Sequence, residues 1–191
     1  MDRKNESAST LDCLRICGVL CAICAAVALL LATVNFITED KIEKNTEIRK
    51  MDSISRIFSV EGVLCTPKAL PDGHERINEI FSVSSEGNLL GYCVGVSSNG
   101  FGGEMELFVG FDTEGKIKGV DIVSHGETPG LGSKIGNEKF LGQFEGMDKI
   151  PTEGQNFEIV SGATKSSRAV AAAVTDAYNA IGKILPGGAG A

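Results

Sequence analysis

The longest run of hydrophobic positions in the chain lies near its N-terminus. No charged residue occurs between Ile16 and Ile37, and Leu, Ile, Val, Ala and Cys fill most of this segment. A helix of this length crosses the ~30 Å hydrocarbon core of a bilayer at ~1.5 Å per residue. Basic residues before the run raise the alternative of a cleaved signal peptide, but the run is too long for its apolar part. The pattern therefore predicts a retained transmembrane helix over residues 16–37.

The residues on either side of this helix predict its orientation. Arg3, Lys4 and Arg15 give the short N-terminal tail an excess of basic residues, which favours its retention in the cytoplasm. We therefore expect a single-pass protein of the inner or plasma membrane, with residues 1–15 as a cytoplasmic tail and the rest outside. Apolar residues keep helical spacing over residues 38–60, which predicts a helical connector.

One buried run rich in apolar residues and β-formers, followed by two alternating runs, predicts an antiparallel sheet after the connector. The expected strands are Leu89–Val96, Met105–Phe111 and Lys116–Ser124. The segment Asp112–Gly115 has the composition of a hairpin turn between the last two strands. Three glycines among residues 100–103 predict a tight loop between the first two.

Helical spacing returns in the C-terminal part of the chain. A short helix is expected at Asn137–Phe144, and a longer one at Lys165–Lys183. These elements predict an α+β fold, with one N-terminal transmembrane helix followed by a single domain over residues 61–185. That domain has an antiparallel sheet and flanking helices. Residues 186–191 are expected to be a flexible tail.

Length, charge and motifs narrow the possible functions. The chain has 191 residues, enough for one membrane segment and one modest domain. Its net charge is −7 and it has no basic stripe, which excludes nucleic acid as a partner. No G-x-G-x-x-G follows a predicted strand, so a nicotinamide site is not expected.

The six cysteines do not combine into a metal site. Four of them lie in or beside the apolar run, where we expect them to behave as small hydrophobic residues: Cys13, Cys17, Cys21 and Cys24. No histidine or second CxxC supports a zinc site at the single CxxC there, so no metal is expected. Cys65 and Cys93 lie in the predicted domain, and the sequence leaves open whether they pair.

Candidate chemistry lies in the segment FEIVSGATKSSR, residues 157–168. The small residues Ser161, Gly162 and Ala163 allow a ligand to approach closely. Thr164 places a hydroxyl beside the N–H groups at the start of the last helix, where the free amides and the helix dipole both favour an anion.

Two further features of this segment bear on its function. Lys165 and Arg168 add positive charge near the start of the helix. The alternative is that Ser161 or Thr164 only caps the helix and binds nothing.

The same segment resembles the flavinylation signature of the FMN-binding domain family, found in Rnf and Na⁺-translocating NADH:quinone reductase complexes. The resemblance implies that a flavin transferase joins the Thr164 hydroxyl to the phosphate of FMN as a phosphoester. Ser161, Gly162 and Ala163 would form the turn. Glu158 stands where the family usually has Asp, which keeps the charge.

A second motif, HGETPGLG at residues 125–132, resembles the loop of this family that lies against the flavin. The resemblance implies that Glu127, Thr128 and Leu131 contact the flavin through hydrogen bonds and ring packing. Without a flavin, the Pro-Gly pair would be a common turn and the histidine an ordinary hydrogen-bonded one.

The resemblance implies an electron carrier with no catalytic residue of its own. The implied function is to relay electrons through FMN in a membrane-bound, ion-translocating ferredoxin:NAD⁺ oxidoreductase, with the other subunits of that complex as partners. Chain length favours the G subunit of Rnf complexes over the C subunit of the Na⁺-translocating NADH:quinone reductase, which is the first alternative. A membrane-anchored sensor or assembly module without flavin is the second. A flavin reductase acting alone lacks a visible substrate motif.

Overall fold

The computed structural model describes residues 3–70, 73 and 75–185 of the chain, and the predicted C-terminal tail lies outside them. The elements in chain order are α1 (Arg3–Phe58), β1 (Leu64–Pro67), β2 (Ile77–Ser85), β3 (Asn88–Asn99), β4 (Glu104–Phe111), β5 (Ile117–His125), η1 (Gly132–Gly136), α2 (Glu138–Leu141), η2 (Gly142–Phe144) and α3 (Thr164–Ile181). The chain divides into two compact units, Met1–Glu47 and Ile48–Ala191.

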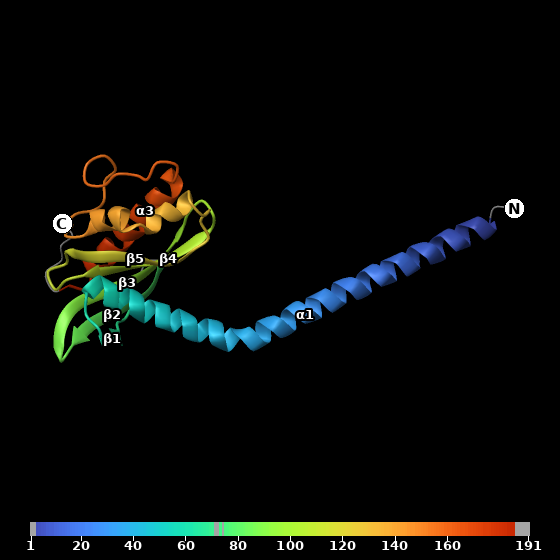
Figure 1. Ribbon diagram of the computed structural model, residues 1–191, viewed down its shortest axis with the longest axis horizontal. Coiled ribbons are helices and arrows are strands. Elements are labelled where there is room, and N and C mark those ends of the chain that lie inside the picture. Colours follow the sequence, from blue (N-terminus) through green and yellow to red (C-terminus); the bar gives the residue numbers. More distant parts are fainter. Residues whose placement is uncertain (1–2, 71–72, 74, 186–191) are drawn as a thin grey trace. The chain divides into compact units, whose positions relative to one another are not determined.

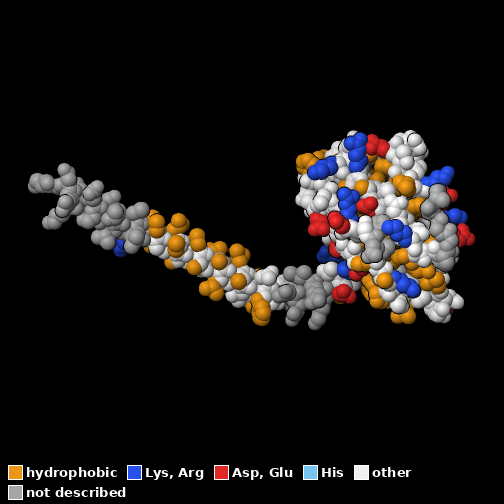
Figure 2. Space-filling view, turned by 180° about the vertical axis from the view of Figure 1, so that it is seen from behind, with side chains coloured by type: hydrophobic (Ala, Val, Ile, Leu, Met, Phe, Trp, Pro, Cys, Tyr) orange, Lys and Arg blue, Asp and Glu red, His pale blue; other side chains and the backbone are white. Residues whose placement is uncertain are grey.

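The N-terminal unit is the first part of α1. It contains a candidate membrane span, Arg15–Thr38, of 24 residues with none of its length buried. Figure 2 shows apolar side chains along this stretch of helix. The predicted apolar helix is therefore present, and it fits a single-pass membrane anchor. Helix α1 continues as far as Phe58, so the predicted connector is helical over most of its length.

The C-terminal unit is built on a five-stranded antiparallel sheet in the order β1-β2-β3-β4-β5, so that each strand pairs with the next in the chain (Figure 1). The three predicted strands correspond to β3, β4 and β5. The predicted turn between β4 and β5 is also present. Asp112 Oδ1 accepts hydrogen bonds from the N–H groups of Glu114 and Lys116, at 2.8 and 2.9 Å. The predicted α+β fold is confirmed.

The structure adds two strands, β1 and β2, that the sequence analysis does not predict. The register between β2 and β3 shifts between Ile77 and Glu79 and again near the end of β2. Such irregularities interrupt the alternation that identifies a strand in a sequence. Glu86 and Gly87 form the two-residue connection to β3, and both have positive φ, 52° and 83°. That geometry is typical of a tight hairpin turn.

The sheet buries both of its faces. Neighbouring residues on a strand point to opposite faces, and Leu107 and Phe108 of β4 accordingly belong to two separate hydrophobic clusters. The cluster around Leu107 packs against α3 and the short helices, which cover one face of the sheet in Figure 1. The cluster around Phe108 includes three residues from the last turns of α1: Ile54, Ile57 and Phe58.

Glycines make room for the last turns of α1 on this second face. A Cβ atom at Gly110 would overlap with Cγ2 of Ile57, and one at Gly119 would lie 3.6 Å from the same atom. Neither glycine has a φ in the left-handed region. It is therefore the close approach of Ile57, and no special backbone conformation, that requires glycine at position 110.

We expect Gly110→Ala to lower the free energy of unfolding by about 1–3 kcal/mol, because the new methyl group must displace Ile57 or the strand. Gly142→Ala is the control. Gly142 is exposed, has a φ of −63°, and has open space where a Cβ would lie. Denaturant unfolding followed by circular dichroism measures both. Equal stabilities of the two variants would contradict this account of the packing.

Cys65 and Cys93 do not pair. Both thiols are free, and strand β2 lies between them, with Val83 paired to Cys65 and Phe81 paired to Cys93. Two strand spacings separate their backbones by roughly 9–10 Å, beyond the reach of a disulfide. Burial raises the pKa of the Cys65 thiol and raises that of Cys93 further, which makes both weak nucleophiles.

Candidate functional site

The segment before α3 forms a tight turn. The N–H of Ala163 donates to the carbonyl oxygen of Val160 at 2.9 Å, and Gly162 has a φ of +82°. That value lies in the left-handed region, which favours glycine. The N–H of Val160 donates to Oγ of the buried Ser167 at 3.0 Å, so the helix itself holds the turn in place.

Helix α3 begins at Thr164 without a side-chain cap. Its N-cap residue is Ala163, and no side chain makes a capping hydrogen bond there. The alternative that Ser161 or Thr164 serves as the cap is therefore wrong. Thr164 is half-buried in the first turn and Ser161 is exposed. The first-turn N–H groups of an α-helix have no partner within the helix, so this helix start keeps donors for an anion.

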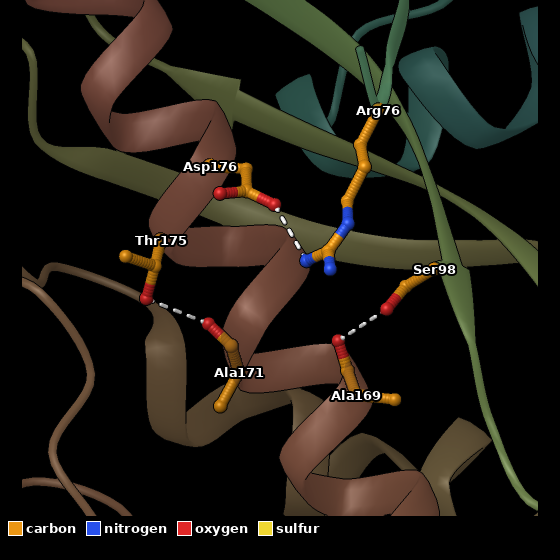
Figure 3. Close-up of polar contacts among 6 residues, drawn as sticks. All are labelled: Arg76, Ser98, Ala169, Ala171, Thr175 and Asp176. Atoms are coloured by element: carbon orange, nitrogen blue, oxygen red, sulfur yellow. Dashed lines mark hydrogen bonds and ion pairs between the residues drawn. The ribbon is translucent and has the colours of Figure 1, made fainter. Parts of the chain in front are cut away.

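Polar contacts and apolar packing together fix α3 on the sheet. The buried Ser98 of β3 donates from its hydroxyl to the carbonyl oxygen of Ala169 at 3.0 Å (Figure 3). Farther along the helix, Asp176 accepts from Arg76 at 3.1 Å. Because both partners come from the sheet region, the position of the Thr164 turn is set by the core of the domain.

The second motif of the sequence analysis lies beside this turn. The N–H of Leu131 donates to the carbonyl oxygen of Thr128 at 3.2 Å, and Gly130 has a φ of +76°, so the Pro129–Gly130 pair does form a turn. This turn exposes Thr128, and it leaves Leu131 53% exposed. Cδ1 of Leu131 lies 3.6 Å from where a Cβ on Gly162 would be. The two motifs are therefore neighbours in space.

A third loop, between β3 and β4, brings an aromatic residue that the sequence analysis missed. Phe101 is 73% exposed, and Nζ of Lys165 lies 5.8 Å from the centroid of its ring, within the range of a cation–π contact. An aromatic residue between Gly100 and Gly102 was the available signal. We use the term three-loop surface for Phe101, Leu131, Gly162, Thr164 and Lys165.

The two basic residues predicted near the turn have different surroundings. Arg168 binds Glu153 through two hydrogen bonds of 2.8 and 3.1 Å. The hydrogen bond from Arg168 lowers the pKa of Glu153 below its usual value and raises that of the guanidinium. Arg168 is thus engaged with a carboxylate, whereas Lys165 lies on the three-loop surface beside Phe101.

Glu127, Thr128 and Leu131 are all predicted flavin contacts, but Glu127 is buried whereas the other two are exposed. The Glu127 side chain is only 5% exposed. Oε1 accepts a hydrogen bond from the N–H of Phe101 at 2.8 Å, and Oε2 is buried without a hydrogen-bond partner among the described residues. The Glu127 N–H donates to Nδ1 of His125 at 3.3 Å.

The short helices hold the beginning of the signature segment. Gln143 makes two hydrogen bonds to the backbone of Glu158: its Oε1 accepts from the N–H at 2.8 Å, and its Nε2 donates to the carbonyl oxygen at 3.3 Å. The ring of Phe157 packs 5.7 Å from that of Phe144. The side chain of Glu158 itself is exposed.

The site suits a phosphate attached to an aromatic group. Among the described residues no side chain caps the first turn of α3, so its amides and Lys165 favour an anion there. The exposed side chains of Phe101 and Leu131 offer apolar surface on adjoining loops. The fold and this site together define an anchored domain that carries a phosphate-bearing cofactor.

Comparison with known proteins agrees with this class. Residues 100–179 match the FMN-binding domain family. The G subunit of the proton-translocating ferredoxin:NAD⁺ oxidoreductase complex of Clostridium ljungdahlii is 31% identical over 129 residues, covering 61% of this chain and 70% of that protein. The G subunit of the Na⁺-translocating ferredoxin:NAD⁺ oxidoreductase complex of Acetobacterium woodii is 27% identical over 176 residues, covering 82% of this chain and 85% of that protein. The chain belongs to the FMN-binding domain family, together with these G subunits.

A solved structure shares the fold. The crystal structure of Shewanella oneidensis NqrC aligns with a TM-score of 0.56 at 18% identity, covering 71% of this chain and 93% of that one. At this identity the likeness establishes the fold only. The predicted resemblance to the family is confirmed, and with it FMN as the cofactor.

Proposed function

We propose that this chain is the electron-carrier subunit of a membrane-bound, ion-translocating ferredoxin:NAD⁺ oxidoreductase. The names of the related G subunits support this role. FMN supplies the redox chemistry, and the protein supplies its position and electrostatic surroundings. The observation that carries the proposal is the three-loop surface, which brings two separate motifs of the FMN-binding domain together at the start of α3.

Thr164 is the proposed attachment residue. Its hydroxyl forms a phosphoester with the phosphate of FMN, and one water is lost overall. The uncapped first turn of α3 supports this assignment, because its free N–H groups stabilise the negative charge of the phosphate. Ser161, Gly162 and Ala163 form the turn that brings the phosphate close to the backbone.

The flavin ring lies on the exposed part of the three-loop surface in this proposal. Thr128 and Leu131 contact it from one loop and Phe101 from another, because these side chains are exposed beside the turn. Lys165 lies in the first turn of α3 with its ammonium over the ring of Phe101, where its charge balances that of the phosphate. Covalent attachment keeps FMN on such an open surface, from which a free cofactor would dissociate.

The basic N-terminal tail supports an orientation in which residues 1–15 are cytoplasmic and the FMN-binding domain, residues 61–185, is extracytoplasmic. The domain then meets other subunits of the complex and a flavin transferase on that side. Protease added to spheroplasts should cleave the domain, and protease added to inside-out vesicles should not. The reverse pattern would refute this orientation.

The role as a complex subunit is tested by purification from a native membrane. The full chain, tagged and expressed with its flavin transferase, should show in-gel flavin fluorescence after denaturation. It should also co-purify with partners that are reduced by ferredoxin or reduce NAD⁺. Co-purification with quinone-reducing partners would instead favour the C subunit of a Na⁺-translocating NADH:quinone reductase. Absence of covalent flavin would favour a sensor or assembly module.

A further inference from the structure

Glycines enclose the carboxylate of Glu127. A Cβ atom at Gly100 would overlap with Oε1, and one at Gly132 would overlap with Oε2. A Cβ at Gly102 would overlap with the carbonyl oxygen of Gly126, the residue before Glu127. The space that holds the carboxylate therefore exists because Gly100 and Gly132 lack side chains, and Gly102 allows the two loop backbones to approach each other.

The enclosed carboxylate joins the two loops of the three-loop surface that lie outside α3. Glu127 belongs to the loop that carries Leu131, and its Oε1 accepts the N–H of Phe101 from the loop between β3 and β4. That hydrogen bond, of 2.8 Å, is partly buried and joins an exposed residue to a side chain that is almost completely buried. Hydrogen bonds to a carboxylate are stronger than those between neutral groups. The backbone of Phe101 is thereby fixed relative to Leu131.

We propose that Glu127 is a positioning residue of the flavin site. Its buried carboxylate holds the Phe101 loop against the Leu131 loop, so that both side chains present fixed surfaces to the flavin ring. This inference rests on the proposed function, in which the flavin lies on the three-loop surface. Glu127 does not itself touch the flavin, because its side chain is almost completely buried beneath that surface.

Four variants of the full chain, each expressed with the flavin transferase, test this role. Glu127→Ala removes the acceptor for the Phe101 N–H. Glu127→Gln keeps an acceptor oxygen in the same place and removes the charge. Gly132→Ala keeps the carboxylate and pushes against Oε2, whereas Gly136→Ala changes the other end of η1, where a Cβ meets open space.

Two measurements distinguish the hydrogen bond between the loops from the orientation of the flavin ring. Hydrogen exchange at the Phe101 amide reports the hydrogen bond. Visible circular dichroism of the attached flavin reports how firmly the ring is oriented. We expect Glu127→Ala to speed the exchange at least about tenfold and to weaken the flavin signal. Gly132→Ala should act in the same direction. Glu127→Gln, which puts a neutral acceptor in place of a charged one, should speed the exchange less than Glu127→Ala does. Gly136→Ala should stay within about twofold of wild type.

Several outcomes would overturn the proposal. Faster exchange in Glu127→Ala with an unchanged flavin signal would show that the loops are joined without orienting the flavin. A loss of flavin signal in Glu127→Gln equal to that in Glu127→Ala would assign the effect to charge. If Glu127→Ala does not fold, Gly132→Ala decides, and wild-type behaviour of that variant would refute the role of the carboxylate.

Failure of the proposed function gives a different result. If intact mass shows no FMN on the wild-type chain while the transferase modifies a control protein, the flavin site is refuted. Exchange at the Phe101 amide still reports whether Glu127 joins the two loops. Conversely, wild type with FMN on Thr164 and no change of the flavin signal in either Glu127→Ala or Gly132→Ala refutes only the positioning role.

Discussion

Thr164→Ala, expressed with a flavin transferase, is expected to carry no covalent FMN, whereas the wild-type chain gains the mass of a single FMN less one water. The change removes the only atom of this side chain that can form the phosphoester. It should leave the fold intact, because Thr164 is half-exposed in the first turn of α3 and makes no cap, and alanine favours a helix. Intact mass and in-gel fluorescence under denaturing conditions measure the result.

Thr175→Ala is the matched control for this experiment. Thr175 lies on the same helix, and its hydroxyl only donates to the carbonyl oxygen of Ala171 at 2.8 Å (Figure 3). This variant should be flavinylated like wild type. Fluorescence retained by Thr164→Ala would place the attachment elsewhere, and fluorescence lost from both variants would show that the effect is indirect.

Phe144→Ala is expected to cause a larger loss of stability than any other substitution proposed for this domain, about 3–5 kcal/mol in the free energy of unfolding. Phe144 is completely buried and packs its ring against those of Phe140 and Phe157, with centroids 5.6 and 5.7 Å away. Its removal leaves a cavity beneath the segment that leads to the Thr164 turn. Denaturant unfolding of the flavin-free chain measures the loss.

The same chemical change at an exposed position provides the control. Phe101→Ala removes a ring that is 73% exposed, and its contact with Lys165 is worth about 0.5–1 kcal/mol at such a site. We therefore expect its stability to stay within about 1 kcal/mol of wild type. A loss in Phe144→Ala as small as that in Phe101→Ala would mean that the aromatic cluster does not support the fold.

The sequence predicts those strands that form long apolar or alternating runs. Strand β3 is a mostly buried run rich in apolar residues, β4 and β5 carry alternating sequence, and Asp112 marks the turn between the last two. Strand β2 is missed because its buried residues, Ile77, Ile80 and Val83, recur at every third position and do not alternate, and β1 because only four residues contribute to it. The two-residue connection Glu86–Gly87 was the remaining signal for the β2–β3 hairpin.

The candidate site likewise contains residues that the sequence predicts and residues that it does not. Thr164 and Leu131 lie in short motifs that can be compared directly with a family, and the structure brings these motifs together. Phe101 precedes both motifs in the sequence and belongs to neither. The burial of Glu127 depends on Gly132 in its own loop and on Gly100 in a different loop. Such contacts between loops have no local periodicity, so neither the burial of Glu127 nor the position of Phe101 beside Lys165 could be predicted from the sequence.

The meander order of the sheet has a consequence for how this domain folds. Every strand pairs with its neighbour in the chain. The sheet can therefore form one hairpin at a time, and each step closes only a short loop of chain. The three-loop surface cannot form in that way, since α3 must dock across β3 before the Thr164 turn meets Leu131. We therefore expect a maturing enzyme to find its acceptor threonine only after the last helix has folded, so that flavin attachment acts as a checkpoint for completed domains.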